Sequence, residues 1–130
     1  MNRVAQFLAD SKAFYLATME DDQPRVRPFG AVAEWDGKMY ICTSNTKKVF
    51  AQMLKNPKVE ISAMVGDIWI RLSGKVVVDS RAEARAAMLE ANPQLKEMYS
   101  ADDGVFEVLY FTDATATFCS YTEAPEEVKL

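Results

Sequence analysis

Residues 67–79 have the pattern of one unusually long β-strand. Apolar side chains take alternate positions from Ile68 to Val76, while Trp69 and Arg71 start the opposite face. This alternation is typical of a strand with one side toward a core. Such a strand is longer than is usual in globular proteins, and a long, bent strand is typical of a small barrel. The segment predicts a barrel-like sheet whose other face suits a subunit interface, the wall of a planar ligand, or simple exposure to solvent.

The rest of the chain alternates strand patterns with a few helical ones. Strands are predicted at residues 13–19, buried on both faces, and at residues 25–35, 38–43, 58–65, 105–111 and 115–121. The first three are predicted to form a meander, in which Asp36-Gly37 is a strong hairpin signal. Helices are predicted at residues 3–10, 46–55, 80–91 and on to residue 99, the third with Ser80 and Glu83 as a capping box. An acidic tail follows residue 122. We predict one domain, residues 1–130, with an α+β arrangement built on an antiparallel β-barrel.

The amino-acid composition excludes several kinds of catalytic and binding chemistry. The chain has no histidine and two cysteines, Cys42 and Cys119, in no paired motif. These counts argue against a structural zinc site and exclude histidine-based nucleophilic catalysis, so an enzyme of this kind needs a cofactor. We expect both cysteines to be buried thiols. Net charge −4 and pI 4.9 argue against nucleic acid. Without an apolar run that could span a bilayer or a secretory signal, we expect no membrane association and a cytoplasmic location.

The junction between the predicted strand at 38–43 and the next helix carries a possible anion site. Thr43 and Ser44 precede Lys47 and Lys48 at the helix start. Lysines are unfavourable at this end of a helix dipole unless an anion lies there. The alternative is a capped helix whose lysines face solvent.

The preceding strand favours the anion. Arg25 and Arg27 share one face of it, and residues 24–58 carry seven basic side chains against two acidic ones in a chain of net charge −4. The alternative to an anion site is that both arginines simply face solvent.

Several motifs then occur in the order and spacing of a known family. They are residues 25–29 (Arg-Val-Arg-Pro-Phe), the Asp36-Gly37 turn, and residues 39–43, 46–48, 56–59 and 69–74. This set resembles the pyridoxamine 5'-phosphate oxidase-like, FMN-binding split-barrel family. The resemblance implies a mainly β (α+β) fold, a six- to seven-stranded antiparallel split β-barrel with peripheral helices, which forms a homodimer and binds FMN at the dimer interface.

The resemblance also implies which residues hold the cofactor. The FMN phosphate would lie at Arg25, Arg27, Thr43, Ser44, Lys47 and Lys48. The flavin ring would face the backbone of Val26, Arg27 and Pro28, with Trp69 of the other subunit as a further wall. With Cys42, these are the predicted cofactor-binding residues, and no catalytic residue is assigned.

The chain looks more similar to the short general-stress and nitroimidazole-resistance-like branches than to the longer oxidases of the family. It lacks the C-terminal Arg and His residues with which the longer oxidases bind their substrate. The first hypothesis is therefore an FMN-dependent oxidoreductase of an unidentified small molecule, with NADH or NADPH as a candidate electron donor. The alternatives are a flavin-binding or electron-transfer module without its own substrate, and a binder of another phosphorylated ligand such as a deazaflavin or pyridoxal phosphate.

Overall fold

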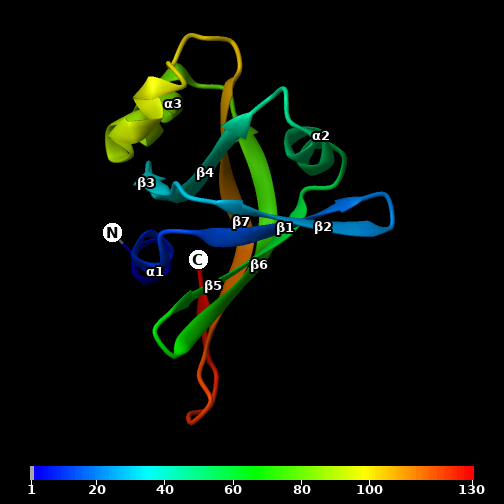
Figure 1. Cartoon of the computed structure of the whole chain (residues 1–130), viewed down its shortest axis with the longest axis vertical. Coiled ribbons are helices and arrows are strands. Elements are labelled where there is room, and N and C mark those ends of the chain that lie inside the picture. The colour runs from blue at the N-terminus through cyan, green and yellow to red at the C-terminus, as the bar shows by residue number, and fades with distance from the viewer. Residues whose placement is uncertain (1) are drawn as a thin grey trace.

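Two long antiparallel strands form the spine of the molecule. In the computed structural model, which describes residues 2–130, they run along most of its length (Figure 1). The strands are β1 (Phe14–Glu20), β2 (Gln23–Phe29), β3 (Ala33–Trp35), β4 (Lys38–Ser44), β5 (Lys58–Val65), β6 (Ile68–Asp79), β7 (Phe106–Cys119) and β8 (Glu126–Lys129). The helices are α1 (Arg3–Ser11), α2 (Lys48–Lys55) and α3 (Ala82–Ala91), followed by the 3₁₀ turn η1 (Pro93–Glu97). The spine consists of β6 and β7.

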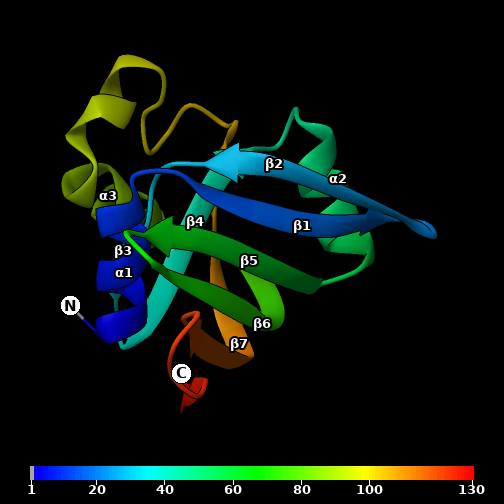
Figure 2. The same ribbon diagram turned by 60° about the horizontal axis from the view of Figure 1, so that its bottom comes forward.

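All eight strands belong to one antiparallel sheet. Its order is β2-β1-β5-β6-β7-β4-β3, and β8 pairs with β7. Figure 2 shows β2, β1, β5 and β6 side by side. The two ends of this path, β2 and β3, do not pair with each other within residues 2–130, so the curled sheet stays open. The predicted mainly β, antiparallel architecture with peripheral helices is confirmed.

Four predictions about the strands are wrong. Residues 25–35 form two strands, because the β1–β2 hairpin holds β2 on β1 while the Asp36-Gly37 hairpin holds β3 on β4, at the opposite end of the sheet. The first strands therefore do not form a meander. Residues 105–121 contain one strand rather than two, since β7 passes through a bulge at Asp113 (φ 49°) opposite Gly74. The predicted acidic tail contains β8, which brings the strands to eight.

Gly74 explains how the bulge is accommodated. A Cβ at this position would lie 2.8 Å from the Cβ of Ala114. Only glycine lets β6 approach the bulged strand this closely.

The core lies inside the curled sheet. Val4 and Leu8 of α1 and Val49 and Met53 of α2 close it, and a second apolar cluster packs under Met88 of α3. Each helix therefore covers the sheet with one apolar face. No helix within residues 2–130 is long and apolar enough to cross a membrane.

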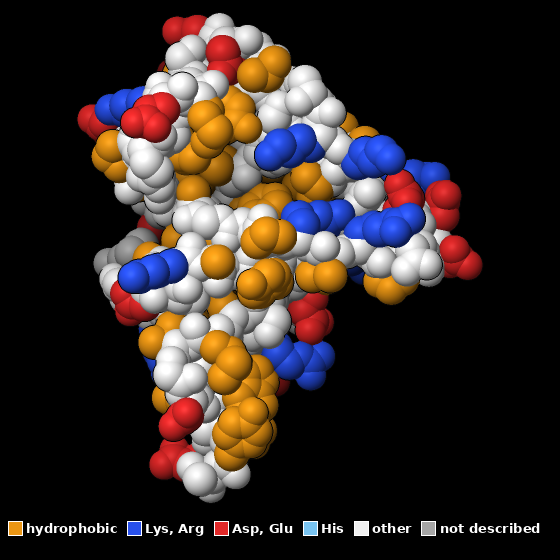
Figure 3. Space-filling view, viewed as in Figure 1, with side chains coloured by type: hydrophobic (Ala, Val, Ile, Leu, Met, Phe, Trp, Pro, Cys, Tyr) orange, Lys and Arg blue, Asp and Glu red, His pale blue; other side chains and the backbone are white. Residues whose placement is uncertain are grey.

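Within residues 2–130, no helix covers the other face of the sheet at β1, β5 and β6 (Figure 2). Tyr15 is 51% exposed, so the prediction that the first strand is buried on both faces is wrong for the single chain. Met64, on the same side of the sheet near the β5–β6 turn, is 53% exposed. Apolar side chains are visible on this part of the surface in Figure 3, whereas Lys and Arg side chains gather over β2 and α2. We call the side of β1, β5 and β6 away from the core the uncovered face.

Candidate cofactor site

Two adjoining cavities lie beside the start of α2. The first, of about 280 Å³, is bounded by the chain from β2 toward β3, by β4, by α2 and by η1. Its lining is residues 27–31, Cys42, Thr43, Lys47, Val49, Gln94, Leu95, Met98 and Tyr99. We call it the apolar cavity.

The second cavity is lined almost entirely by polar and charged side chains. It measures about 330 Å³ and is formed by Glu20, Arg25, Arg27, Lys48 and Gln52. We call it the polar hollow. Arg25 is paired with Glu20 at 2.8 Å, whereas Lys48 makes no ion pair with any part of residues 2–130. The hollow therefore carries an excess of positive charge.

Arg27 lies where the two cavities meet, and its guanidinium is held in place. Nη1 donates to Thr18 Oγ1 at 2.7 Å and to the Leu16 carbonyl at 3.2 Å, and Nη2 donates to Gln52 Oε1 at 2.9 Å. Burial, and then the charge of Arg25, lower the pKa of Arg27 from its ordinary value. An anion in the hollow would offset both effects.

The start of α2 has no side-chain cap. Lys47 is its N-cap residue, so the helix begins at Lys48 rather than at residue 46 as predicted. The Ser44 hydroxyl is instead engaged within the turn, 2.7 Å from Thr46 Oγ1, and accepts from the Thr46 amide. Amides in the first turn of α2 therefore have no side-chain acceptor, which favours an anion beside them.

Cys42 is a wall of the apolar cavity. Burial raises the pKa of its thiol to about 12, although the nearby charge of Lys47 opposes this. The thiol is therefore protonated at neutral pH and is a poor nucleophile. Cys42 and Cys119 are both free thiols, and both are only partly buried rather than fully buried as predicted.

The structure brings most of the predicted site residues together. Arg27, Pro28, Cys42, Thr43 and Lys47 line the apolar cavity, and Arg25, Arg27 and Lys48 line the polar hollow.

Three predicted residues lie elsewhere in the single chain. Val26 is 68% exposed and lines neither cavity. Ser44 is buried in its turn. Trp69 packs against Tyr121, with the two rings tilted by 53° and their centroids 5.0 Å apart, and it also lines neither cavity. Its role as a wall contributed by another subunit stays a prediction.

Sequence reasoning missed Gln52 and the wall formed by η1. Gln52 follows Lys48 by four residues, so the two share one side of α2, and this spacing was the available signal. Leu95 of η1 and Tyr99, two residues after its end, reach the cavity from a distant part of the chain. No local pattern in the sequence indicates that approach.

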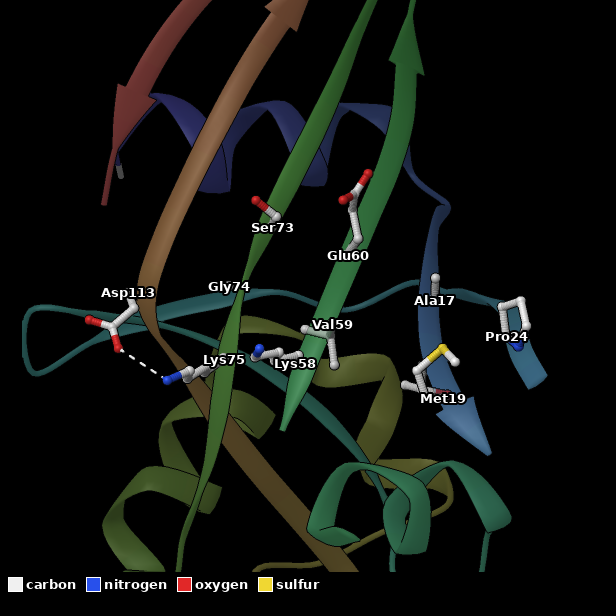
Figure 4. Close-up of a pocket in the computed structure, with 11 residues that line it drawn as sticks. Ala17, Met19, Pro24, Lys58, Val59, Glu60, Ser73, Gly74, Lys75 and Asp113 are labelled. Carbon is white, nitrogen blue, oxygen red and sulfur yellow. Dashed lines mark ion pairs between the residues drawn. The ribbon is translucent and has the colours of Figure 1, made fainter. Parts of the chain in front are cut away.

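A third cavity, of about 420 Å³, lies away from the predicted site. Figure 4 shows Met19, Lys58, Glu60 and Lys75 around it, with Lys75 4.0 Å from Asp113. Its lining includes none of the predicted cofactor-binding residues.

Comparison with known proteins defines the class. The family model for pyridoxamine 5'-phosphate oxidase matches residues 1–118, and the chain belongs to this family. A solved structure of a NimC/NimA family protein from Clostridium acetobutylicum is 56% identical, with a TM-score of 0.96, over 98% of this chain and 90% of that one. No curated protein matched the chain.

More distant structures share the fold. General Stress Protein 26 from Bacillus anthracis is 17% identical with a TM-score of 0.76, over 96% of this chain and 94% of that one. A pyridoxamine 5'-phosphate oxidase-related, FMN binding protein from Nostoc punctiforme is 11% identical with a TM-score of 0.68, over 97% and 92% of the two chains. The resemblance to this split-barrel family, including its NimC/NimA and general-stress relatives, is confirmed.

Proposed function

We propose that this protein binds FMN, with the phosphate in the polar hollow and the flavin ring in the apolar cavity. The observation that carries the proposal is the junction of the two cavities at Arg27, which joins a cationic compartment to an apolar one. A flavin mononucleotide likewise joins an anionic phosphate to a largely apolar ring system. The family match and the FMN-binding protein with the same fold support this choice of ligand.

The residues present fit this cofactor. The cavities measure about 280 and 330 Å³, and together they lie within the range of about 300–1,000 Å³ usual for small-molecule sites. Lys48, Arg27 and the uncapped start of α2 would hold the phosphate. Pro28, Leu95 and Tyr99 would shield the ring from water.

The site favours redox chemistry over acid–base catalysis. Among residues 2–130, Glu20 is the only carboxylate that lines either cavity, and it is paired with Arg25. The Cys42 thiol is protonated, so the walls offer no evident general base. When bound, the flavin would supply hydride or electron transfer, while the chain binds and orients it. We therefore propose an FMN-dependent oxidoreductase acting on a small molecule.

Anaerobic flavin titration of the purified protein tests this proposal. We expect FMN to bind with a perturbed visible spectrum, and riboflavin to bind more weakly because it lacks the phosphate. NADH and NADPH are then added, and loss of the flavin absorbance at 450 nm, roughly where oxidised flavins absorb, supports the oxidoreductase. A bound flavin that neither nucleotide reduces favours the electron-transfer module. A spectrum that stays unchanged on adding FMN contradicts the proposal.

We also propose that a second copy of the chain covers the uncovered face and brings its Trp69 toward the apolar cavity. The half-exposed side chains of Tyr15 and Met64 support this arrangement, since apolar surface of this kind is costly to leave in water. Light scattering should give twice the 14.6 kDa of one chain at micromolar concentration. Met64→Glu should weaken the dimer. The matched control is Leu54→Glu, which changes an exposed residue of α2 and should leave the dimer intact. A wild-type monomer would refute the dimer.

A further inference from the structure

Gln52 is a polar side chain buried among three elements. It lies on α2, is 8% exposed, and is hydrogen-bonded to β1 and β2. Its Oε1 accepts from Thr18 Oγ1 at 2.6 Å and from Arg27 Nη2 at 2.9 Å, while Thr18 Oγ1 accepts from Arg27 Nη1 at 2.7 Å. The three side chains form a closed triangle of hydrogen bonds that fixes the guanidinium.

The chemistry of Arg27 fixes which way the amide of Gln52 points. A guanidinium has donors only, so the atom that faces it has to be the carbonyl oxygen. The amide nitrogen therefore points away from Arg27, and it donates to no group within residues 2–130. No fully buried side-chain N or O atom among these residues lacks a partner, so this nitrogen is open to the polar hollow that Gln52 lines.

We propose that Gln52 is a phosphate ligand of the FMN site, in which its amide nitrogen donates to a phosphate oxygen while its oxygen holds Arg27. This inference rests on the proposed function, because the phosphate belongs to the FMN proposed there. The oxygen of Gln52 would then hold Arg27 in place while its nitrogen contacts the ligand. The amide also adds a neutral donor to a hollow that Lys48 and Arg27 line. The hollow would thereby favour a phosphate monoester over a ligand without one.

Gln52→Glu separates a ligand from a residue that only positions Arg27. The substituted carboxylate still accepts from Thr18 and Arg27, so a residue that positions Arg27 and lies out of reach of the phosphate predicts FMN binding close to that of the wild type. A phosphate ligand predicts weaker binding, because an amide donor is replaced by a charged oxygen that repels phosphate. We expect FMN affinity to fall about a hundredfold, and riboflavin affinity to change by less than about threefold.

The measurement is fluorescence titration of each variant with FMN and with riboflavin. Retained riboflavin binding shows that the variant is folded. The matched control is Gln94→Glu, which makes the same exchange in the apolar cavity and should change the two affinities equally. Equal losses for FMN and riboflavin in Gln52→Glu, or no loss, overturn the inference while the proposed function stands. A wild-type protein that binds neither flavin overturns both.

Discussion

Replacing Asp79 by alanine is expected to lower the free energy of unfolding by about 3 kcal/mol. Asp79 ends β6 and is 6% exposed. Its Oδ1 accepts from the Arg81 amide and Nε at 3.1 and 3.0 Å, and its Oδ2 accepts from Arg81 Nη2 at 2.8 Å and from Tyr40 Oη at 2.7 Å. The Tyr40 hydroxyl, on a side chain only 1% exposed, would lose this acceptor. Arg81 can reach water, which keeps the loss at the lower end for a broken buried pair.

Thermal unfolding measures this loss. A decrease in Tm of about 10 °C is expected for a chain of this size. The matched control is Asp102→Ala, because Asp102 is an exposed loop carboxylate that makes no hydrogen bond within residues 2–130, and its removal should cost less than about 0.5 kcal/mol. Equal Tm values for Asp79→Ala and Asp102→Ala would show that the Asp79 contacts contribute nothing.

The difference in unfolding free energy between wild type and Asp79→Ala is expected to depend on pH. The side chain of Arg81 holds the pKa of Asp79 well below its ordinary value of 3.8. A depressed pKa gives stability that is complete above the unfolded-state value and is lost as pH falls toward the folded-state value. The difference between wild type and Asp79→Ala should therefore be constant near neutrality and shrink below about pH 4. A difference that stays constant down to pH 2 would contradict this origin.

Asp79 also illustrates where local patterns in the sequence fail. The spacing of Ser80 and Glu83 predicts a capping box, yet the N-cap of α3 is Arg81, without a side-chain bond. The Asp79 carboxylate accepts the Arg81 amide instead, and Arg81 lies 4.8 Å over the ring of Trp35. Tertiary contacts with β3 and β4 thus override a motif defined only by neighbours in the chain.

Most of the fold was predictable because it depends on periodicity and turns. The alternation from Ile68 to Val76 indicated β6, and Asp36-Gly37 indicated the β3–β4 hairpin. The break within residues 25–35 was not predictable, since each half pairs with a strand at a different end of the sheet. Such pairing depends on the topology of the whole sheet, and no local sequence pattern indicates it.

The candidate site was likewise predictable only in part from the sequence. The role of Lys47 and Lys48 at an anion site could be predicted, because the positive end of the helix dipole depends only on where the helix begins in the sequence. The burial of Gln52 against Thr18 and Arg27, and the approach of η1 to the apolar cavity, arise only once the sheet has curled. Sequence patterns therefore located the cationic part of the site and missed the side chains that shape it.

The double substitution Lys47→Ala with Lys48→Ala is expected to weaken FMN binding about a hundredfold and to leave riboflavin binding within about threefold. Lys47 lines the apolar cavity and Lys48 the polar hollow, and the two are consecutive residues at the start of α2. Neither makes an ion pair within residues 2–130, and both lie at a helix start without a side-chain cap. This crowding of positive charge is unfavourable until a dianion binds.

Titration of the double variant with both flavins gives the measurement, and Lys96→Ala with Lys129→Ala is the matched control. The control also removes two positive charges, but from exposed positions that line neither cavity. It should change FMN affinity only slightly, because the interactions of solvent-exposed charges that do not contact the ligand are largely screened at ordinary ionic strength. If both double variants lose FMN affinity equally, net charge rather than position is responsible. If Lys47→Ala with Lys48→Ala weakens FMN and riboflavin to the same extent, the lysines do not bind the phosphate, and the polar hollow holds some other part of the ligand.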